Sequence, residues 1–173
     1  MIRFFDFILS LCGLLILLPV LLIIFIYGLF ENGSPIFKQK RVGIKEKSFL
    51  LFKFRTMDKN TESVATHLVN ESLITKYGSF LRRTKLDELP QLFNVLIGDM
   101  SLVGPRPCLF NQTRLLNERK KRGVFNVKPG ITGLAQISGI SMKTPLLLAK
   151  TDLKMIKNFN LLRYFYYILK TLF

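Results

Sequence analysis

The 173-residue sequence contains no tryptophan, one histidine and only two cysteines. Cys12 and Cys108 are too few and too far apart for a disulfide scaffold, and they lack the spacing of zinc ligands. Acidic residues are also scarce, because 11 Asp and Glu stand against 26 Lys and Arg, for a formal net charge of +15. This excess predicts anionic partners such as phosphates, acidic lipid headgroups or nucleic acid. The 49% of hydrophobic residues exclude a disordered chain.

Charge is absent altogether from residues 7–30. As a helix this run would be about 36 Å long, enough to cross a bilayer core of about 30 Å. Pro19 stands in its middle, removes one backbone donor and predicts a kink or a break. Two interpretations remain open: a kinked spanning helix, which central prolines of membrane helices favour, or a re-entrant hairpin that returns to the same face. Both place the basic remainder of the chain in the cytoplasm.

The part that follows the turn residues 31–35 is expected to form one small α+β unit. Strands are predicted at 36–41 and 49–55, and helical spacing is present at 74–81, 86–97, 109–122 and 145–157, the third of these as a basic surface helix. Residues 159–173 combine Phe, Tyr and Leu with two cations, as in a helix that lies in the membrane interface. The polar stretch 58–73 is expected to be a helix or mobile loop, with His67 exposed rather than catalytic.

The sharpest candidate site is the acidic pair Asp87 and Glu88, which follows three cations. Pro90 is tolerated in a first helical turn, so the pair is expected near a helix N-terminus. In a structural interpretation Asp87 caps the helix, or closes a capping box with Thr84, and Glu88 complements the helix dipole. In a chemical interpretation one carboxylate attacks a phosphoryl group, its neighbour holds Mg²⁺, and Arg82 and Arg83 clamp phosphate oxygens.

Two further basic segments are candidates for phosphate binding. Arg106 lies between two prolines, which stiffen the backbone and hold the guanidinium with little entropy left to lose. The alternative is a surface loop with a solvated arginine. Lys53 and Arg55 alternate with phenylalanines, so on a strand they share one face. The alternative for this segment is an amphipathic strand with a wet basic face.

At these residues the sequence resembles the bacterial sugar transferase family, the monotopic phosphoglycosyl transferases that begin glycan assembly on a polyprenyl phosphate. The two most specific stretches are LDELPQLFNVL at 86–96 and GDMSLVGPRP at 98–107. Shorter matching stretches occur in the family's order at 3–7, 33–37, 52–57, 81–84 and 128–133. Together they cover nearly the whole chain.

The resemblance implies an α+β fold in two parts. Residues 1–32 would form a re-entrant membrane anchor, a helix broken near Pro19, which favours the hairpin over the span. Residues 33–173 would form a small, mostly helical catalytic domain with a short β-hairpin and interfacial amphipathic helices. The expected location is the bacterial inner (cytoplasmic) membrane, with the catalytic domain on the cytoplasmic side.

The resemblance also implies a ping-pong phosphosugar transfer. Asp87 would attack the β-phosphate of a UDP-sugar and release UMP, and polyprenyl phosphate would then take the phosphosugar from the covalent intermediate. Glu88, together with Asp87, would hold Mg²⁺. The residues expected to bind substrate phosphates are Arg82, Arg106, Lys53 and Arg55. The expected partners are a UDP-sugar, polyprenyl phosphate and membrane lipid but no nucleic acid, and a homodimer is allowed.

Three positions depart from the family pattern. Leu18 stands where a serine often precedes the helix-breaking proline, and Leu134 stands where the family usually has tryptophan. Ile140 replaces the arginine of a Gly-Arg pair, so one expected phosphate or nucleotide contact is missing. Two alternatives therefore stay open: a catalytically impaired family member that acts as an assembly partner, and a membrane-anchored basic binding module. No motif distinguishes the sugar or the glycan pathway.

Overall fold

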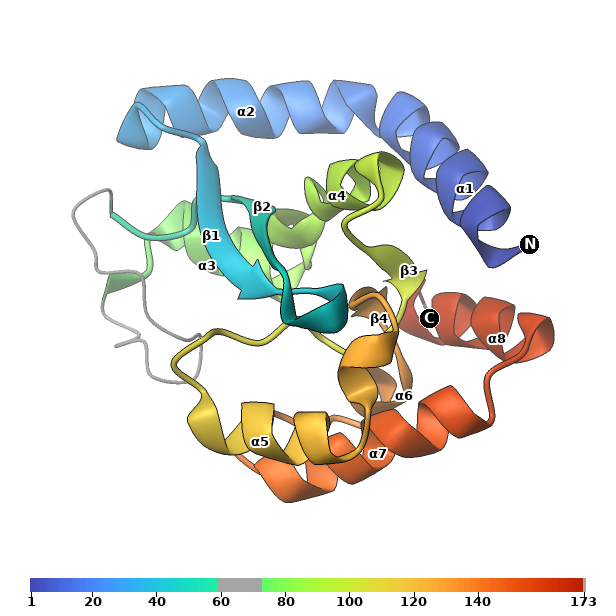
Figure 1. The fold of residues 1–173 in the computed structure, drawn as a ribbon. Helices are drawn as coiled ribbons and strands as arrows, with labels where there is room; N and C mark the ends of the chain where they lie inside the picture. The colour runs from blue at the N-terminus through green and yellow to red at the C-terminus, as the bar shows by residue number, and fades with distance from the viewer. Residues whose placement is uncertain (59–72, 173) are drawn as a thin grey trace.

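Two helices that meet at a bend lie along one side of the computed structural model, which describes residues 1–58 and 73–172 (Figure 1). Helix α1 (Ile2–Ile16) and helix α2 (Leu18–Asn32) are separated by Leu17 and bent by 63°. Pro19 is the second residue of α2, where its missing N–H removes no helical hydrogen bond. The helix therefore breaks two residues before the proline.

The bent pair has the composition of a membrane segment. Among the described residues no single helix is long and apolar enough to cross a bilayer, whereas α1 and α2 together pass by length and composition. Large apolar side chains on both helices are exposed, including Leu15, Ile16, Ile23 and Phe30. Such a surface in water would be unfavourable, and lipid or another apolar partner would cover it.

A β-hairpin follows the helix pair and confirms both predicted strands. β1 (Ile36–Val42) pairs antiparallel with β2 (Ser48–Phe54), and the turn between them contains the short helix η1 (Ile44–Glu46). The free edge of β2 is occupied by a side chain of α4 (Gln91–Ile97). Asn94 donates to the carbonyl of Leu50 at 2.7 Å and accepts from the amide of Phe52 at 3.0 Å. This side chain holds α4 in a fixed position along the hairpin.

A second, parallel pair of strands was not predicted. β3 (Ser101–Val103) pairs with β4 (Gly130–Thr132) and brings the 98–107 and 128–133 segments together. Three-residue strands are too short to show alternation in a sequence. The approach is close enough to require glycine, because a Cβ at Gly130 would lie 1.9 Å from the amide nitrogen of Gly104.

The remaining helices pack around these strands. They are α3 (Lys76–Arg83), η4 (Leu86–Glu88), α5 (Thr113–Lys121), η5 (Val124–Asn126), α6 (Leu134–Ile137), α7 (Pro145–Lys157) and α8 (Leu161–Leu172). The helix at 145–157 has the predicted bounds, and α3, α5 and α8 differ from prediction mainly at their ends. The single helix expected over 86–97 is wrong at its start, because Pro90 separates η4 from α4. The stretch around His67 lies outside the described residues.

Asp6 fixes the N-terminal helix on the rest of the fold. Its Oδ1 atom accepts from the Ser101 hydroxyl at 3.0 Å, the Leu102 amide at 2.9 Å and the Tyr164 hydroxyl at 2.9 Å. These bonds join α1 to β3 and α8, and the main hydrophobic cluster lies beside them around Val95, Met100 and Tyr164. A buried carboxylate with three donors is well satisfied, so these bonds hold the first turns of α1 against β3 and α8.

Candidate active site

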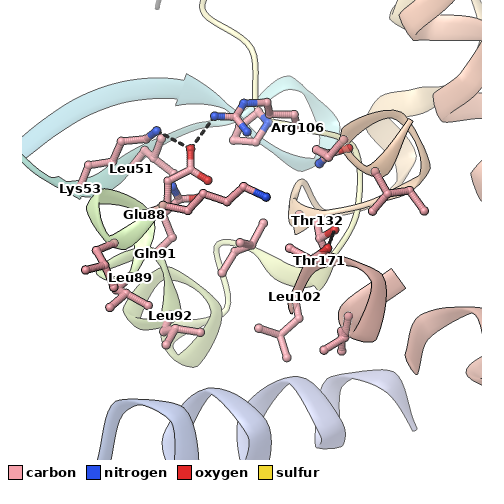
Figure 2. Close-up of a pocket in the computed structure, with 18 of the residues that line it drawn as sticks. Leu51, Lys53, Glu88, Leu89, Gln91, Leu92, Leu102, Arg106, Thr132 and Thr171 are labelled. Atoms are coloured by element: carbon pink, nitrogen blue, oxygen red, sulfur yellow. Dashed lines mark hydrogen bonds and ion pairs between the residues drawn. The ribbon is translucent and has the colours of Figure 1, made fainter. Parts of the chain in front are cut away.

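Glu88 lies between two cations that come from different segments of the chain (Figure 2). Its Oε1 atom accepts from Nζ of Lys53 on β2 at 2.8 Å and from Nη2 of Arg106 at 2.5 Å. The Glu88 and Lys53 side chains are only 18% and 16% exposed, whereas that of Arg106 is 40% exposed. Burial alone would raise the pKa of Glu88, but Arg106 and Lys53 outweigh it and lower this pKa to about 2. The three charges sum to about +1, so this Glu88 cluster (Lys53, Glu88, Arg106) attracts an anion.

Asp87 is the more buried member of the acidic pair, with 9% of its surface exposed. Burial raises its pKa, an effect that Lys53 and Arg82 oppose and Glu88 reinforces. Environments that push the pKa values of two neighbouring carboxylates apart are typical of sites where the two have different tasks. The predicted capping role of Asp87 is wrong, because Pro90 occupies the N-cap of α4 and no side chain caps that helix.

The other predicted site residues lie at different distances from this cluster. Arg82 donates from Nε to the hydroxyl of Thr56 at 2.9 Å, and it is electrostatically coupled to Asp87. Arg55 is directed elsewhere: its Nε donates to the carbonyl of Ser34 at 2.8 Å, and its guanidinium lies over the ring of Phe37. Lys53 and Arg55 therefore do not form one basic face, because β2 ends at Phe54.

The predicted capping box of Thr84 and Asp87 is absent. The Thr84 hydroxyl instead donates to the carbonyls of Phe80 and Leu81 at the C-terminal end of α3. The backbone then turns through Lys85, which has a left-handed φ of 57°. That turn separates α3 from η4 and gives Thr84 no access to the amides that a capping box would serve.

A cavity of about 1030 Å³ opens beside the Glu88 cluster. Lys53, Glu88 and Arg106 line one part of it, and Leu9, Gly13 and Leu17 of the bent helix pair line another. Figure 2 shows Leu92 and Leu102 between them, directed toward the N-terminal helices. Leu86 and Glu88 line the cavity, whereas Asp87 is not one of its lining residues. The cavity thus connects the charged side chains of the Glu88 cluster with apolar residues of the bent helix pair.

The opposite wall of the cavity includes residues from the C-terminal part of the chain. Thr132 of β4 and Thr171 of α8 share a hydrogen bond there (Figure 2). Lys170 of α8 also lines the cavity and adds positive charge. Ile140 is another wall residue, so the position that departs from the expected Gly-Arg pair faces the same space.

The acidic pair fits a magnesium ion only in one way. Among the described residues, no group of three or more His, Cys, Asp and Glu side chains is placed to hold a metal. Both cations bind Oε1 of Glu88, which leaves Oε2 and the Asp87 carboxylate as the nearest acidic oxygens. Mg²⁺ often takes one or two carboxylates and completes its shell with phosphate oxygens and water. The pair suits that mode of binding and not a preformed protein cage.

Sequence reasoning missed the buried residues that support the cluster. Arg119 was expected on the surface of a basic helix, but it is 1% exposed and pairs with Asp152 of α7. Arg41 is also buried, and burial together with Arg106 lowers its pKa to about 10. Partners so far apart in the chain leave no local pattern. A single Asp on the apolar face of 145–157 was the one available signal.

Comparison with known proteins gives a consistent result. The family model described as "Bacterial sugar transferase" matches residues 1–173. An "Uncharacterized sugar transferase EpsL" of Bacillus subtilis is 52% identical over 108 residues. A "UDP-glucose:undecaprenyl-phosphate glucose-1-phosphate transferase" of Xanthomonas campestris is 42% identical over 148 residues. An "Undecaprenyl-phosphate galactose phosphotransferase" of Salmonella typhimurium is 38% identical over 154 residues.

The matches cover much of this chain but only part of each relative. They span 62% of the chain and 53% of the Bacillus protein, 81% and 30% for the Xanthomonas protein, and 79% and 32% for the Salmonella protein. The chain therefore corresponds to about half of one relative and a third of the other two.

Proposed function

The chain belongs to the bacterial sugar transferase family, and we propose that it transfers a phosphosugar from a UDP-sugar to polyprenyl phosphate. The products would be a polyprenyl diphosphate-sugar and UMP. The names of the Xanthomonas and Salmonella relatives support this general reaction. The observation that carries the proposal is the cavity, because it joins the Glu88 cluster to the bent apolar helices.

The proposed chemistry has two half-reactions at one phosphorus atom. An Asp87 oxygen attacks the β-phosphorus of the donor, the bond from that phosphorus to the bridging oxygen breaks, and UMP leaves with the electron pair. An oxygen of polyprenyl phosphate then attacks the same phosphorus and displaces Asp87 as a free carboxylate. Burial, which raises the pKa of Asp87, keeps this carboxylate poorly solvated and favours its use as a nucleophile. Donor binding would turn the side chain toward the adjacent cavity.

The cations and Glu88 would share the task of holding the phosphates. Arg106, the most exposed member of the Glu88 cluster, would contact donor phosphate oxygens, and Lys53 would supply a second positive charge. Arg82, which is electrostatically coupled to Asp87, would add a third positive charge for the donor phosphates. Asp87 and Glu88 would contribute oxygens to Mg²⁺, which when bound neutralises charge that develops on the diphosphate.

The proposed membrane arrangement places the acceptor beside this site. Residues 1–32 would enter the inner membrane from the cytoplasmic side and return, and residues 33–173 would stay on that side. The lipid phosphate lies at the interface, so a cavity that starts at Gly13 and Leu17 would receive it at a fixed depth. Restricting both partners to one plane raises their effective concentration.

The experiment that tests this function is a UMP-release assay in detergent with polyprenyl phosphate and a panel of UDP-sugars. We expect release with at least one donor, and loss of release when EDTA removes the metal. Asp87→Asn serves as the inactive control. Absence of UMP release with every donor, from protein that is folded by circular dichroism, would overturn the proposal.

A second candidate function rests on Ile140. The resemblance predicts an arginine at this position, and the isoleucine found there lines the cavity. A catalytically impaired member that binds donor without turnover would retain UDP affinity and release no UMP. Restoring the charge with Ile140→Arg would then raise UMP release, and no such rise is expected if the chain is already active with Lys170 in the same wall.

A further inference from the structure

The short segment 104–108, which carries Arg106, is held at every backbone carbonyl. The donors come from β1, α5, α6 and the start of β4 rather than from one neighbouring strand. The carbonyls of Gly104, Pro105, Arg106, Pro107 and Cys108 accept from Gln136 Nε2, the Gly130 amide, Arg119 Nη1, Arg41 Nη1 and the Val42 amide, respectively. Prolines at 105 and 107 fix φ on both sides of Arg106. Segment 104–108 therefore has little freedom, and its one ionised side chain is Arg106.

Two of these donors, Arg41 and Arg119, are buried cations, and Arg119 differs from Arg41 because it pairs with a buried carboxylate. Its side chain is 2% exposed, and Nε and Nη2 both donate to Oδ2 of Asp152, at 3.0 and 2.8 Å. The third donor, Nη1, reaches the carbonyl of Arg106 at 2.8 Å. Burying an ion pair is costly, and a pair that only joined α5 to α7 could be replaced by apolar residues with little loss. The bond to the Arg106 carbonyl gives this pair a second task.

We propose that Arg119, oriented by Asp152, is a positioning residue that holds Arg106 at the donor diphosphate. Asp152 fixes the plane of the Arg119 guanidinium, and that plane directs Nη1 at the carbonyl of residue 106. The Arg106 side chain starts from that same residue and ends on Glu88, 2.5 Å away. A displacement of the carbonyl moves the guanidinium relative to the Glu88 cluster, where small errors in position are expensive for catalysis. This inference rests on the proposed function.

The test is a double-mutant cycle between residues 119 and 106, measured both by UDP binding calorimetry and by the UMP-release rate. Arg119→Lys can keep the ion pair with Asp152 but cannot also reach the Arg106 carbonyl. We expect it to weaken UDP binding and lower kcat by about tenfold each in the wild-type background. In the Arg106→Ala background the same change is expected to have no further effect on either quantity.

The matched control is Arg122→Lys, because Arg122 lies at the end of the same helix and pairs with Glu118 within one turn. It is expected to leave UDP binding and kcat unchanged. If Arg119→Lys does not fold, Asp152→Asn loosens the same guanidinium without changing its size and enters the cycle instead. Equal losses in both backgrounds, or a full-strength Arg119→Lys enzyme, would overturn the positioning role. A wild-type protein that binds UDP but releases no UMP would overturn the transferase and leave the binding cycle decisive.

Discussion

The Glu88 cluster and the Arg119–Asp152 pair are both built from one carboxylate and basic side chains, but they differ in the number of cations. Glu88 meets two cations, faces a cavity and leaves about one positive charge unbalanced. Asp152 meets one cation, is fully buried and leaves none. The first arrangement has positive charge left for an anion, whereas the second is neutral by itself, although Asp152 Oδ1 has no hydrogen-bond partner among the described residues. The presence of an ion pair therefore does not by itself indicate a ligand site. What distinguishes the two is the number of cations for each carboxylate and whether a cavity gives access to them.

The largest effect on activity is expected at Asp87, the acidic neighbour of the Glu88 cluster. Asp87→Asn should lower UMP release by at least about 1000-fold, because an amide cannot form the phosphosugar adduct. Its thermal stability should not fall at neutral pH, because burial raises the pKa of Asp87 and the amide removes that charge penalty. Intact-protein mass spectrometry after donor addition checks the adduct. A variant that still forms it would remove Asp87 from the mechanism.

Breaking the Arg119–Asp152 pair should lower the stability of the folded protein. Asp152→Ala leaves Arg119 buried without its counter-ion, and we expect a loss of about 3–5 kcal/mol in the free energy of unfolding, measured with denaturant. The joint replacement Arg119→Met with Asp152→Leu should lose much less, because no charge is then left unpaired. A cost below 1 kcal/mol for the single change would mean that water reaches this pair, contrary to its burial.

Acid should remove the contribution of the Glu88 cluster to folding stability in a defined pH window. The pKa of Glu88 is depressed to about 2, so its stabilising effect is complete above the usual value near 4.5 and is lost as the pH falls through about 2. Glu88→Gln lacks this titration, so the difference between the two stability curves should change by about 3 kcal/mol across this pH window. Thermal melts at several pH values, compared between wild type and variant, make the measurement. Parallel curves would contradict the pKa assignment.

The smallest effect is expected for a pair that belongs to neither region. Lys120 and Glu46 lie 3.1 Å apart with side chains 67% and 45% exposed. Glu46→Gln should change the free energy of unfolding by less than about 0.5 kcal/mol, and UMP release should stay unchanged. Raising the salt concentration should remove even this difference. A larger loss would show that exposure is a poor guide to the worth of these pairs.

The two regions also differ in how well the sequence predicts them. Glu88, Lys53 and Arg106 were singled out because an acidic pair, an alternating strand and a proline-flanked arginine are local patterns. Arg119 and Asp152 are 33 residues apart on different helices, and their meeting depends on packing that no window of sequence contains. The pairing of β3 with β4 was missed for the same reason. The hairpin and the helix at 145–157 were predictable because periodicity alone fixes them.

The two hydrogen bonds of Asn94 to the backbone of β2 help to set the position of α4 along that strand. Because Asn94 binds the carbonyl of Leu50 and the amide of Phe52, which face the same edge of β2, a slip of one residue would turn these backbone groups away from α4. A slip of a single residue would exchange Lys53 for a phenylalanine opposite Glu88, since neighbouring side chains on a strand face opposite ways. The carboxylate would then lose its lysine while every helix stayed intact. Correct alignment of α4 on β2 is thus required for Lys53 to meet Glu88.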